Sequence, residues 1–189
     1  KWNLSRFAEC LIPLIDKNQN KAVEQASEII SSFEKKYEEK WLNMMRDKLG
    51  LFGVDEKDKY LILDLLTWMH QEKMDYTNTF CHLMNFEVAN KENFKKDDFE
   101  NWKKRWQKRL KIYNNTPEKY LKLMRSVNPL VIPRNHKVEE VLNEANNGNI
   151  EPFNKFLEVL NKPYLEQRDI INYQMPIYSN EKYQTFCGT

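Results

Sequence analysis

The apolar residues recur at steps of three and four along most of this chain, the spacing that places them on one face of an α-helix. The longest stripe covers residues 21–49, and Gly50 behind it is a natural helix terminator. Residues 55–71 are apolar on most sides, which predicts a helix in the centre of the domain. The other stripes predict further helices over 3–15, 75–83, 97–110, 116–127, 135–146 and 151–160.

Several of these helices have recognisable start and stop signals. Asn3 and Asp75 are suitable N-caps, and Thr116 is an N-cap followed by Pro117 at the first helical position. Pro13 should kink or tighten the first helix near its end. The short link between the last two helices predicts that they pack as an antiparallel hairpin.

Two segments lack a helical period. Residues 90–96 are polar and predict a loop. After Pro163, Pro, Tyr, Asn and Gln dominate, so we expect residues 164–189 to be extended and held on the body by their aromatic side chains. The predicted fold is an all-α, multi-helix bundle with an irregular C-terminal tail. Residues 1–127 form its helical core, and residues 128–189 form a hairpin and tail packed on it in one structural unit.

Composition supports a folded domain and excludes some partners. The chain has 189 residues, of which 41% are hydrophobic and 13% aromatic, enough for a packed core. Its 4 glycines supply little hairpin chemistry. The net charge of +2 gives no general attraction to nucleic acid or anionic lipid, and the apolar runs fall far short of the roughly 20 residues of a membrane span. We therefore expect neither a nucleic-acid nor a membrane partner.

A basic cluster stands out in the segment 103–111, beside Trp102 and Trp106. A nucleic-acid surface is one interpretation. The tryptophans, however, share the apolar face of the helix, and acidic residues precede the basic ones, as the helix dipole favours. We therefore favour a solvated helix face. The three histidines are isolated and no Cys-x-x-Cys spacing occurs, so no metal site is predicted.

The three cysteines, Cys10, Cys81 and Cys187, are far apart and odd in number, which fits a reducing compartment. Cys10 and Cys81 lie in apolar helical patterns, where a buried inert thiol is expected. Cys187 is third from the end and is our redox candidate, with an incidental tail cysteine as the alternative. Glycine-rich phosphate loops and distinct carboxylate pairs are missing, so the residues alone indicate a scaffold without catalytic, cofactor-binding or metal-binding residues.

Several short blocks together resemble the selenoprotein O family, pseudokinase-fold proteins that transfer AMP to protein hydroxyls. They follow the family order over essentially the whole chain. The blocks are WNLSRFAE at 2–9, MRDKLGL at 45–51, DYTNTF at 75–80, Trp102 and Trp106 with Arg109-Leu110, Asn128-Pro129, PRN at 133–135, KPY at 162–164, Tyr173 with Pro176, and Cys187 near the end.

The resemblance implies helices of a kinase-like C-lobe plus a helical extension. The family's nucleotide-binding, metal-binding and catalytic residues precede the first block, so it also implies a non-catalytic, C-terminal fragment. We accordingly expect Lys1 to be a boundary left by truncation or proteolysis. The intact parent would use ATP and Mg²⁺ (or Mn²⁺) to modify Ser, Thr or Tyr hydroxyls of protein substrates. It would lie in the cytoplasm of a bacterium, or in mitochondria if eukaryotic.

The same resemblance gives this chain its expected partners. They are the N-terminal catalytic part of the same protein and the parent's substrates. Cys187 would close a disulfide with a thiol in that other part. The alternative is a helical protein-interaction module with no enzymatic role. Exposed apolar surface beside the first helix would favour the former, and a dimer through that face is a further option.

Overall fold

The computed structural model describes residues 1–86, 88, 91–113, 116–168 and 170–177, and these residues contain helices and no strands. The all-α prediction is thereby confirmed. The α-helices are α1 (Trp2–Ile15), α2 (Gln19–Lys48), α3 (Asp58–Gln71), α4 (Tyr76–Leu83), α5 (Asp97–Leu110), α6 (Pro117–Val127), α7 (Asn135–Asn146), α8 (Glu151–Leu160) and α9 (Ile171–Gln174). A 3₁₀ helix, η1 (Lys91–Lys95), precedes α5.

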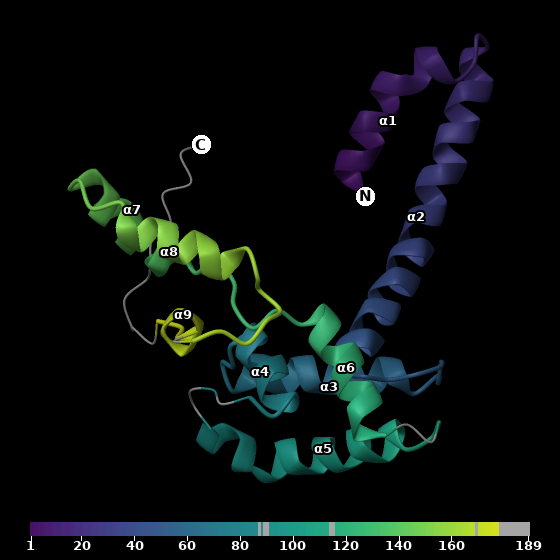
Figure 1. Ribbon diagram of the computed structural model, residues 1–189. Helices are drawn as coiled ribbons and strands as arrows, with labels where there is room; N and C mark the ends of the chain where they lie inside the picture. The colour runs from purple at the N-terminus through teal and green to yellow at the C-terminus, as the bar shows by residue number, and fades with distance from the viewer. Residues whose placement is uncertain (87, 89–90, 114–115, 169, 178–189) are drawn as a thin grey trace. The chain divides into compact units, whose positions relative to one another are not determined.

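The chain forms two compact units, residues 1–45 and 46–189, with α2 beginning in the first and ending in the second. In the first unit α1 folds back along α2 as a helical hairpin (Figure 1). The predicted boundary between residues 127 and 128 stays a prediction. Among the described residues, every helix is too short or too polar to cross a lipid bilayer.

The N-terminal ends of both helices in the first unit differ from the sequence prediction. α1 starts before Asn3, because the Ser5 amide already donates to the Lys1 carbonyl at 3.0 Å. α2 starts at Gln19, because the Asn18 side chain accepts hydrogen bonds from the backbone amides of Asn20 and Lys21, at 3.0 and 3.2 Å. Pro13 lies inside α1, which continues for two more residues.

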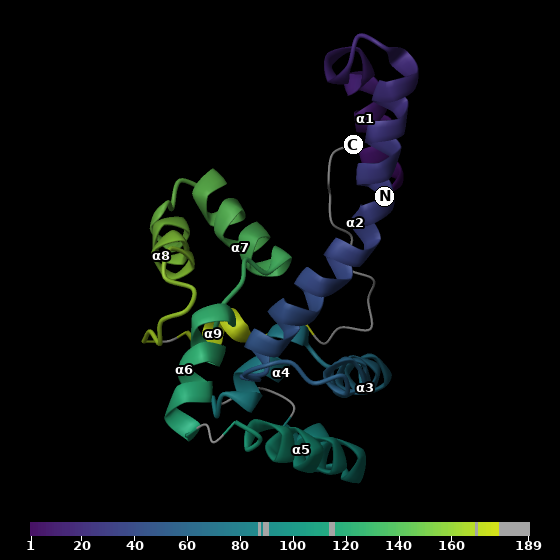
Figure 2. The same cartoon turned by 90° about the vertical axis from the view of Figure 1, so that its right-hand side faces the viewer.

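The core of the second unit is built where α3 packs on α5 (Figure 2). α3 does not lie buried on all sides as its composition predicted. Leu61, Ile62 and Leu65 are buried, whereas Tyr60 is 69% exposed. The helix is covered by neighbours on one face only, so its apolar composition overstates its burial. It also begins three residues later than predicted, because Asp55 to Lys57 form a turn closed by the Asp55 carboxylate.

The predicted loop at residues 90–96 is wrong for its central part, which is the helix η1. Phe94 of η1 is 3% exposed and packs against Trp68, with ring centroids 5.6 Å apart, and stacks on His82 at 3.8 Å. One apolar residue in a polar run is enough to fold this segment onto the core. A single apolar residue shows no periodicity, so the sequence pattern could not predict this helix.

The C-terminal part follows the sequence prediction closely. α7 and α8 have the predicted bounds and pack on each other (Figure 2). The described residues beyond Pro163, which are 164–168 and 170–177, are irregular except for α9, a short helix that the prediction missed. Tyr173 of α9 stacks on Phe156 of α8 at a centroid distance of 5.4 Å, so this part of the tail is held by an aromatic contact as expected.

Gly50 should tolerate substitution less well than Gly148. Its φ of +69° favours glycine, and an added Cβ would lie 3.0 Å from the Tyr120 Cβ and 3.1 Å from the Tyr120 carbonyl oxygen. We expect Gly50→Ala to lower the free energy of unfolding by about 2 kcal/mol or more. Gly148→Ala is the matched control: φ is +88° but the space is open, so only about 1 kcal/mol should be lost. Urea unfolding of both variants checks the difference, and equal losses would contradict it.

Candidate functional site

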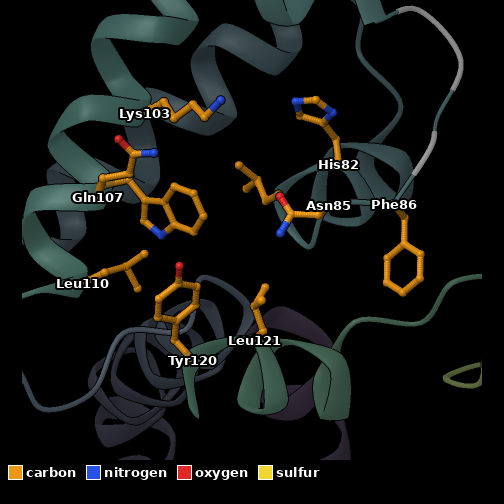
Figure 3. A pocket seen from close by; sticks show the side chains of 10 residues that line it. His82, Asn85, Phe86, Lys103, Gln107, Leu110, Tyr120 and Leu121 are labelled. Atoms are coloured by element: carbon orange, nitrogen blue, oxygen red, sulfur yellow. The ribbon is translucent and has the colours of Figure 1, made fainter. Parts of the chain in front are cut away.

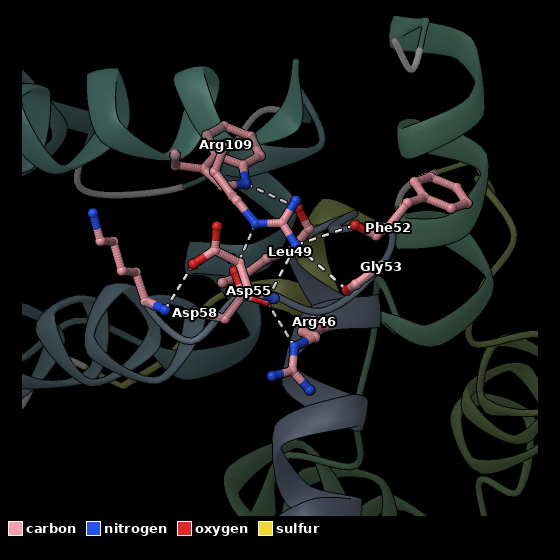
Figure 4. A network of polar contacts seen from close by, with 9 residues as sticks. Arg46, Leu49, Phe52, Gly53, Asp55, Asp58 and Arg109 are labelled. Carbon is pink, nitrogen blue, oxygen red and sulfur yellow. Dashed lines mark hydrogen bonds and ion pairs between the residues drawn. The ribbon is translucent and has the colours of Figure 1, made fainter. Parts of the chain in front are cut away.

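The first polar cluster of the second unit centres on Asp58, whose side chain is fully buried (Figure 4). The Arg46 Nε donates to its Oδ2 at 2.7 Å. Arg109 donates from Nε to Oδ1 at 2.7 Å and from Nη2 to Oδ2 at 3.1 Å. One carboxylate thus joins the end of α2, the start of α3 and the end of α5. We call these three residues the Asp58 clamp.

The clamp also fixes the connection between α2 and α3. Arg109 Nη2 donates to the carbonyl oxygens of Phe52 and Gly53 at 3.1 and 3.4 Å, and the Asp55 amide donates to Asp58 at 3.1 Å. Burial alone would raise the pKa of Asp58. The hydrogen bonds from Arg109 and Arg46 outweigh it, so the pKa lies below its usual value. A carboxylate whose pKa is lowered in this way and that is held by two arginines suits a structural clamp rather than proton transfer.

The prediction that Arg109 belongs to a solvated basic face is wrong, because this side chain is 7% exposed and paired. The rest of the cluster fits better. Arg105 forms an exposed ion pair with Asp64, and Trp102 and Trp106 lie in the core as expected. Their indole N–H groups donate to the carbonyls of Leu61 and Leu49, both at 2.8 Å.

A second cluster joins α4 to the chain near Arg134. Arg134 forms a two-pronged ion pair with Asp75 at 2.7 and 2.9 Å. Asp75 also accepts from the Asn78 amide at 2.8 Å, which confirms its predicted role as the N-cap of α4. The Asn78 side chain donates to the Gln174 carbonyl at 3.1 Å, and Gln174 donates to the Leu130 carbonyl at 2.7 Å. The DYTNTF and PRN blocks therefore anchor α9.

The cysteines fall into three different situations. Cys81 is buried, its thiol lies 3.8 Å from the Pro129 carbonyl, and burial together with nearby Asp75 raises its pKa to about 12. This agrees with the expected inert thiol. The expectation of burial is wrong for Cys10, because α1 has no buried residue. Cys187, the redox candidate, lies outside the described residues.

A cavity of about 390 Å³ opens between the end of α4, α5 and α6 (Figure 3). Lys103 and Gln107 of α5 line one side, and Asn85 and Tyr120 line the facing sides. Asn85 lies two residues after the end of α4 and has a φ of +68°, and its backbone N–H donates to the His82 carbonyl at 2.9 Å. We call this space the α4–α6 pocket. Sequence reasoning did not find it, because its residues come from three separate elements.

Groups of three or more His, Cys, Asp or Glu side chains positioned for a metal ion are not found among the described residues. What these residues do build are two polar clusters that hold helices together and several pockets, of which the α4–α6 pocket is one. Of the residues that form the ion pairs in the two clusters, all but one belong to the family blocks found in the sequence. The exception is Asp58.

The fold and the two clusters define an all-α protein whose helices are held together by the motif residues. Comparison with known proteins identifies its family. The model of the family described as "Protein adenylyltransferase SelO" matches residues 1–161. The chain belongs to this family, as the sequence blocks predicted. It is 55% identical to the protein nucleotidyltransferase YdiU of Pelagibacter ubique, and 44% and 43% identical to those of Alcanivorax borkumensis and Geobacillus kaustophilus. These alignments cover 100% of this chain and 39–40% of the relatives, so the chain spans about two fifths of their length.

Proposed function

We propose that this chain is the non-catalytic, C-terminal helical region of a protein adenylyltransferase. The parent moves AMP from ATP to Ser, Thr or Tyr hydroxyls of protein substrates, with Mg²⁺ or Mn²⁺ as cofactor, in the reducing cytoplasm of a bacterium. ATP and metal bind to the part of the parent that this chain does not contain. The observation that carries this proposal is the family match over residues 1–161.

The roles of the motif residues support a structural contribution. Arg46 and Arg109 form ion pairs with Asp58, and Arg134 forms an ion pair with Asp75. The two tryptophans of the α5 block, Trp102 and Trp106, are buried. Phosphoryl and nucleotidyl transfer instead need metal and phosphate ligands arranged around an open site. The motif residues therefore stabilise the helical region on which such a site can be built.

Exposed apolar surface in the first unit supports a partner there. α1 buries no residue: Trp2 is 72%, Phe7 62% and Leu14 82% exposed. An apolar groove of about 310 Å³ runs between α1 and α2. Contiguous apolar surface of this kind marks an interface. Its place beside the first helix is where we expected the rest of the parent to dock, so we favour that partner over an independent interaction module or a dimer.

The placement of the ATP site is tested by calorimetry. Titrating ATP with Mg²⁺ into the 189-residue chain should give no binding heat. Micromolar affinity would overturn the proposal that the nucleotide site lies elsewhere in the parent.

The adenylyltransferase assignment needs a longer protein. A chimera should be made in which this chain replaces the matching two fifths of the Pelagibacter ubique relative. We expect it to transfer labelled AMP from ATP to protein at a rate within about tenfold of the unaltered relative, because the chain is 55% identical to the region it replaces. The same AMP-transfer assay should also be run with the separate 189-residue chain added to the relative from which the matching region has been removed. Activity in that mixture would show that the two parts can dock without being covalently joined. A folded but inactive chimera would count against the proposal.

We also propose that Cys187 forms a disulfide with a thiol in the remainder of the parent. Two thiols would lose two electrons and two protons to an oxidant such as oxidised glutathione. Peptide mapping of the oxidised chimera should find Cys187 in a disulfide, with Cys81 still reduced because its pKa of about 12 leaves almost no thiolate. Cys187→Ser should abolish the bond and Cys10→Ser should not. A Cys187 that stays reduced would contradict this role.

A further inference from the structure

The α4–α6 pocket gathers polar side chains from three helices around one space (Figure 3). On α5, Lys103, Gln107 and Leu110 lie one helical turn apart and form one wall. Asn85 follows α4 with its amide directed into the pocket, and the Tyr120 hydroxyl of α6 points into it from below. The pocket thus has a defined polar interior rather than a smooth apolar surface.

Most of these polar groups have no partner among the residues that the structure describes. Among the described residues, the structure gives no hydrogen bond to the side chains of Asn85, Gln107 or Tyr120. Lys103 lies 3.6 Å from Glu100 in a half-exposed pair, which holds the ammonium only weakly. Three neutral hydrogen-bonding groups are therefore free to bind a ligand, and Lys103 can exchange its weak pairing with Glu100 for a bound anion.

The charge and shape of the pocket indicate the ligand's chemistry. Lys103 carries its one permanent charge, and none of its lining residues, all of them described, is acidic. A single ammonium with neutral donors suits a monoanion such as a carboxylate, whereas phosphate sites usually contain arginine or several cations. Phe86, Trp106 and Leu121 supply apolar walls, and a volume of about 390 Å³ suits a molecule the size of an indole derivative.

We propose that the α4–α6 pocket binds a carboxylate carried on a flat apolar body, with Lys103 as its counter-ion and Asn85, Gln107 and Tyr120 as hydrogen-bonding partners. This inference does not depend on the adenylyltransferase assignment, because it uses only the geometry of the second unit.

Indole-3-acetate and its uncharged analogue indole-3-acetamide are suitable probes. In amide-resolved NMR titrations of the 189-residue chain, indole-3-acetate should shift signals at the end of α4, in α5 and in α6. It should bind at least about fivefold more tightly than the acetamide, because only the acid forms a charge-assisted hydrogen bond with Lys103.

Lys103→Met should remove that preference, while Lys104→Met, a neighbouring exposed lysine on the same helix that does not line the pocket, should retain it. Tyr120→Phe should weaken both probes. Shifts elsewhere in the chain, equal binding of acid and amide, or equal effects of the two lysine variants would overturn the proposal.

A second titration distinguishes two possible sources of the carboxylate, the C-terminus of a peptide and a free small molecule. The peptide acetyl-Gly-Gly-Trp carries its carboxylate on a protein C-terminus. Binding about tenfold tighter than indole-3-acetate would identify a peptide end as the ligand, and weaker binding a free small molecule. Failure of both acids to reach the pocket would count against it, whatever the outcome of the AMP-transfer assay.

Discussion

Asp58→Asn is expected to lower the free energy of unfolding by about 3–5 kcal/mol, the usual cost of removing one partner from a buried ion pair. The Asp58 carboxylate has no exposed surface and accepts hydrogen bonds from Arg46 and Arg109, which are themselves 10% and 7% exposed. Asparagine fills the same space but carries no charge, so the guanidinium groups of Arg46 and Arg109 would lose the buried carboxylate that they share. Urea unfolding monitored by circular dichroism measures the loss.

The exposed pair of Arg105 and Asp64 provides the matched control. The side chains are 55% and 49% exposed, although the N–O distance of 2.7 Å equals that within the Asp58 clamp. Asp64→Asn should therefore cost less than about 1 kcal/mol. Similar losses for the two variants would show that burial does not set the strength of the clamp.

The Asp58 clamp also predicts a pH dependence. Because the pKa of Asp58 is lower in the folded than in the unfolded chain, its stabilisation is fully present above the ordinary value of 3.8. It is lost as the pH falls through the folded-state pKa. The difference in stability between the unaltered chain and Asp58→Asn should accordingly shrink in that acidic window and stay constant above it. A difference that grows on acidification would contradict this sign.

Helical periodicity located the helices well, and burial follows it in several of them. α5 shows this clearly: Phe99, Trp102, Trp106 and Leu110 share a face and are all buried. The predictions failed where side chains at the ends of elements decide the outcome. Asn18 starts α2 early, and Phe94 folds a polar segment into η1. Such effects depend on one residue and leave no period in the sequence.

The polar clusters were harder to predict, because their partners are distant in sequence. Arg109 lies 51 positions from Asp58 in the sequence. It has five other lysines and arginines around it in α5 and just after it, all of them exposed or half-exposed. Only its step of three from Trp106 indicated that it shares the buried face of α5. Asp75 was predicted as an N-cap from its local sequence, but its pairing with Arg134 required the folded chain.

Phe99 lies at the centre of the aromatic core that α3, η1 and α5 share. Its side chain has no exposed surface, and its ring centroid lies 4.6 Å from that of Trp68, 5.0 Å from Phe94 and 5.7 Å from Trp102. The rings around it come from three elements, so no single movement can close the space that Phe99 fills. Its removal should therefore leave a cavity rather than a local rearrangement.

Phe99→Ala is expected to cost about 3–5 kcal/mol, the sum of the lost apolar burial and the cavity left behind. Phe99→Leu, which refills part of the space, should cost less than half as much. Tyr60→Ala on α3 is the control, since a side chain that is 69% exposed should change stability by no more than about 0.5 kcal/mol. Urea unfolding with an unchanged slope is the measurement. A loss near that of Tyr60→Ala would mean that the aromatic core does not hold α3 and α5 together.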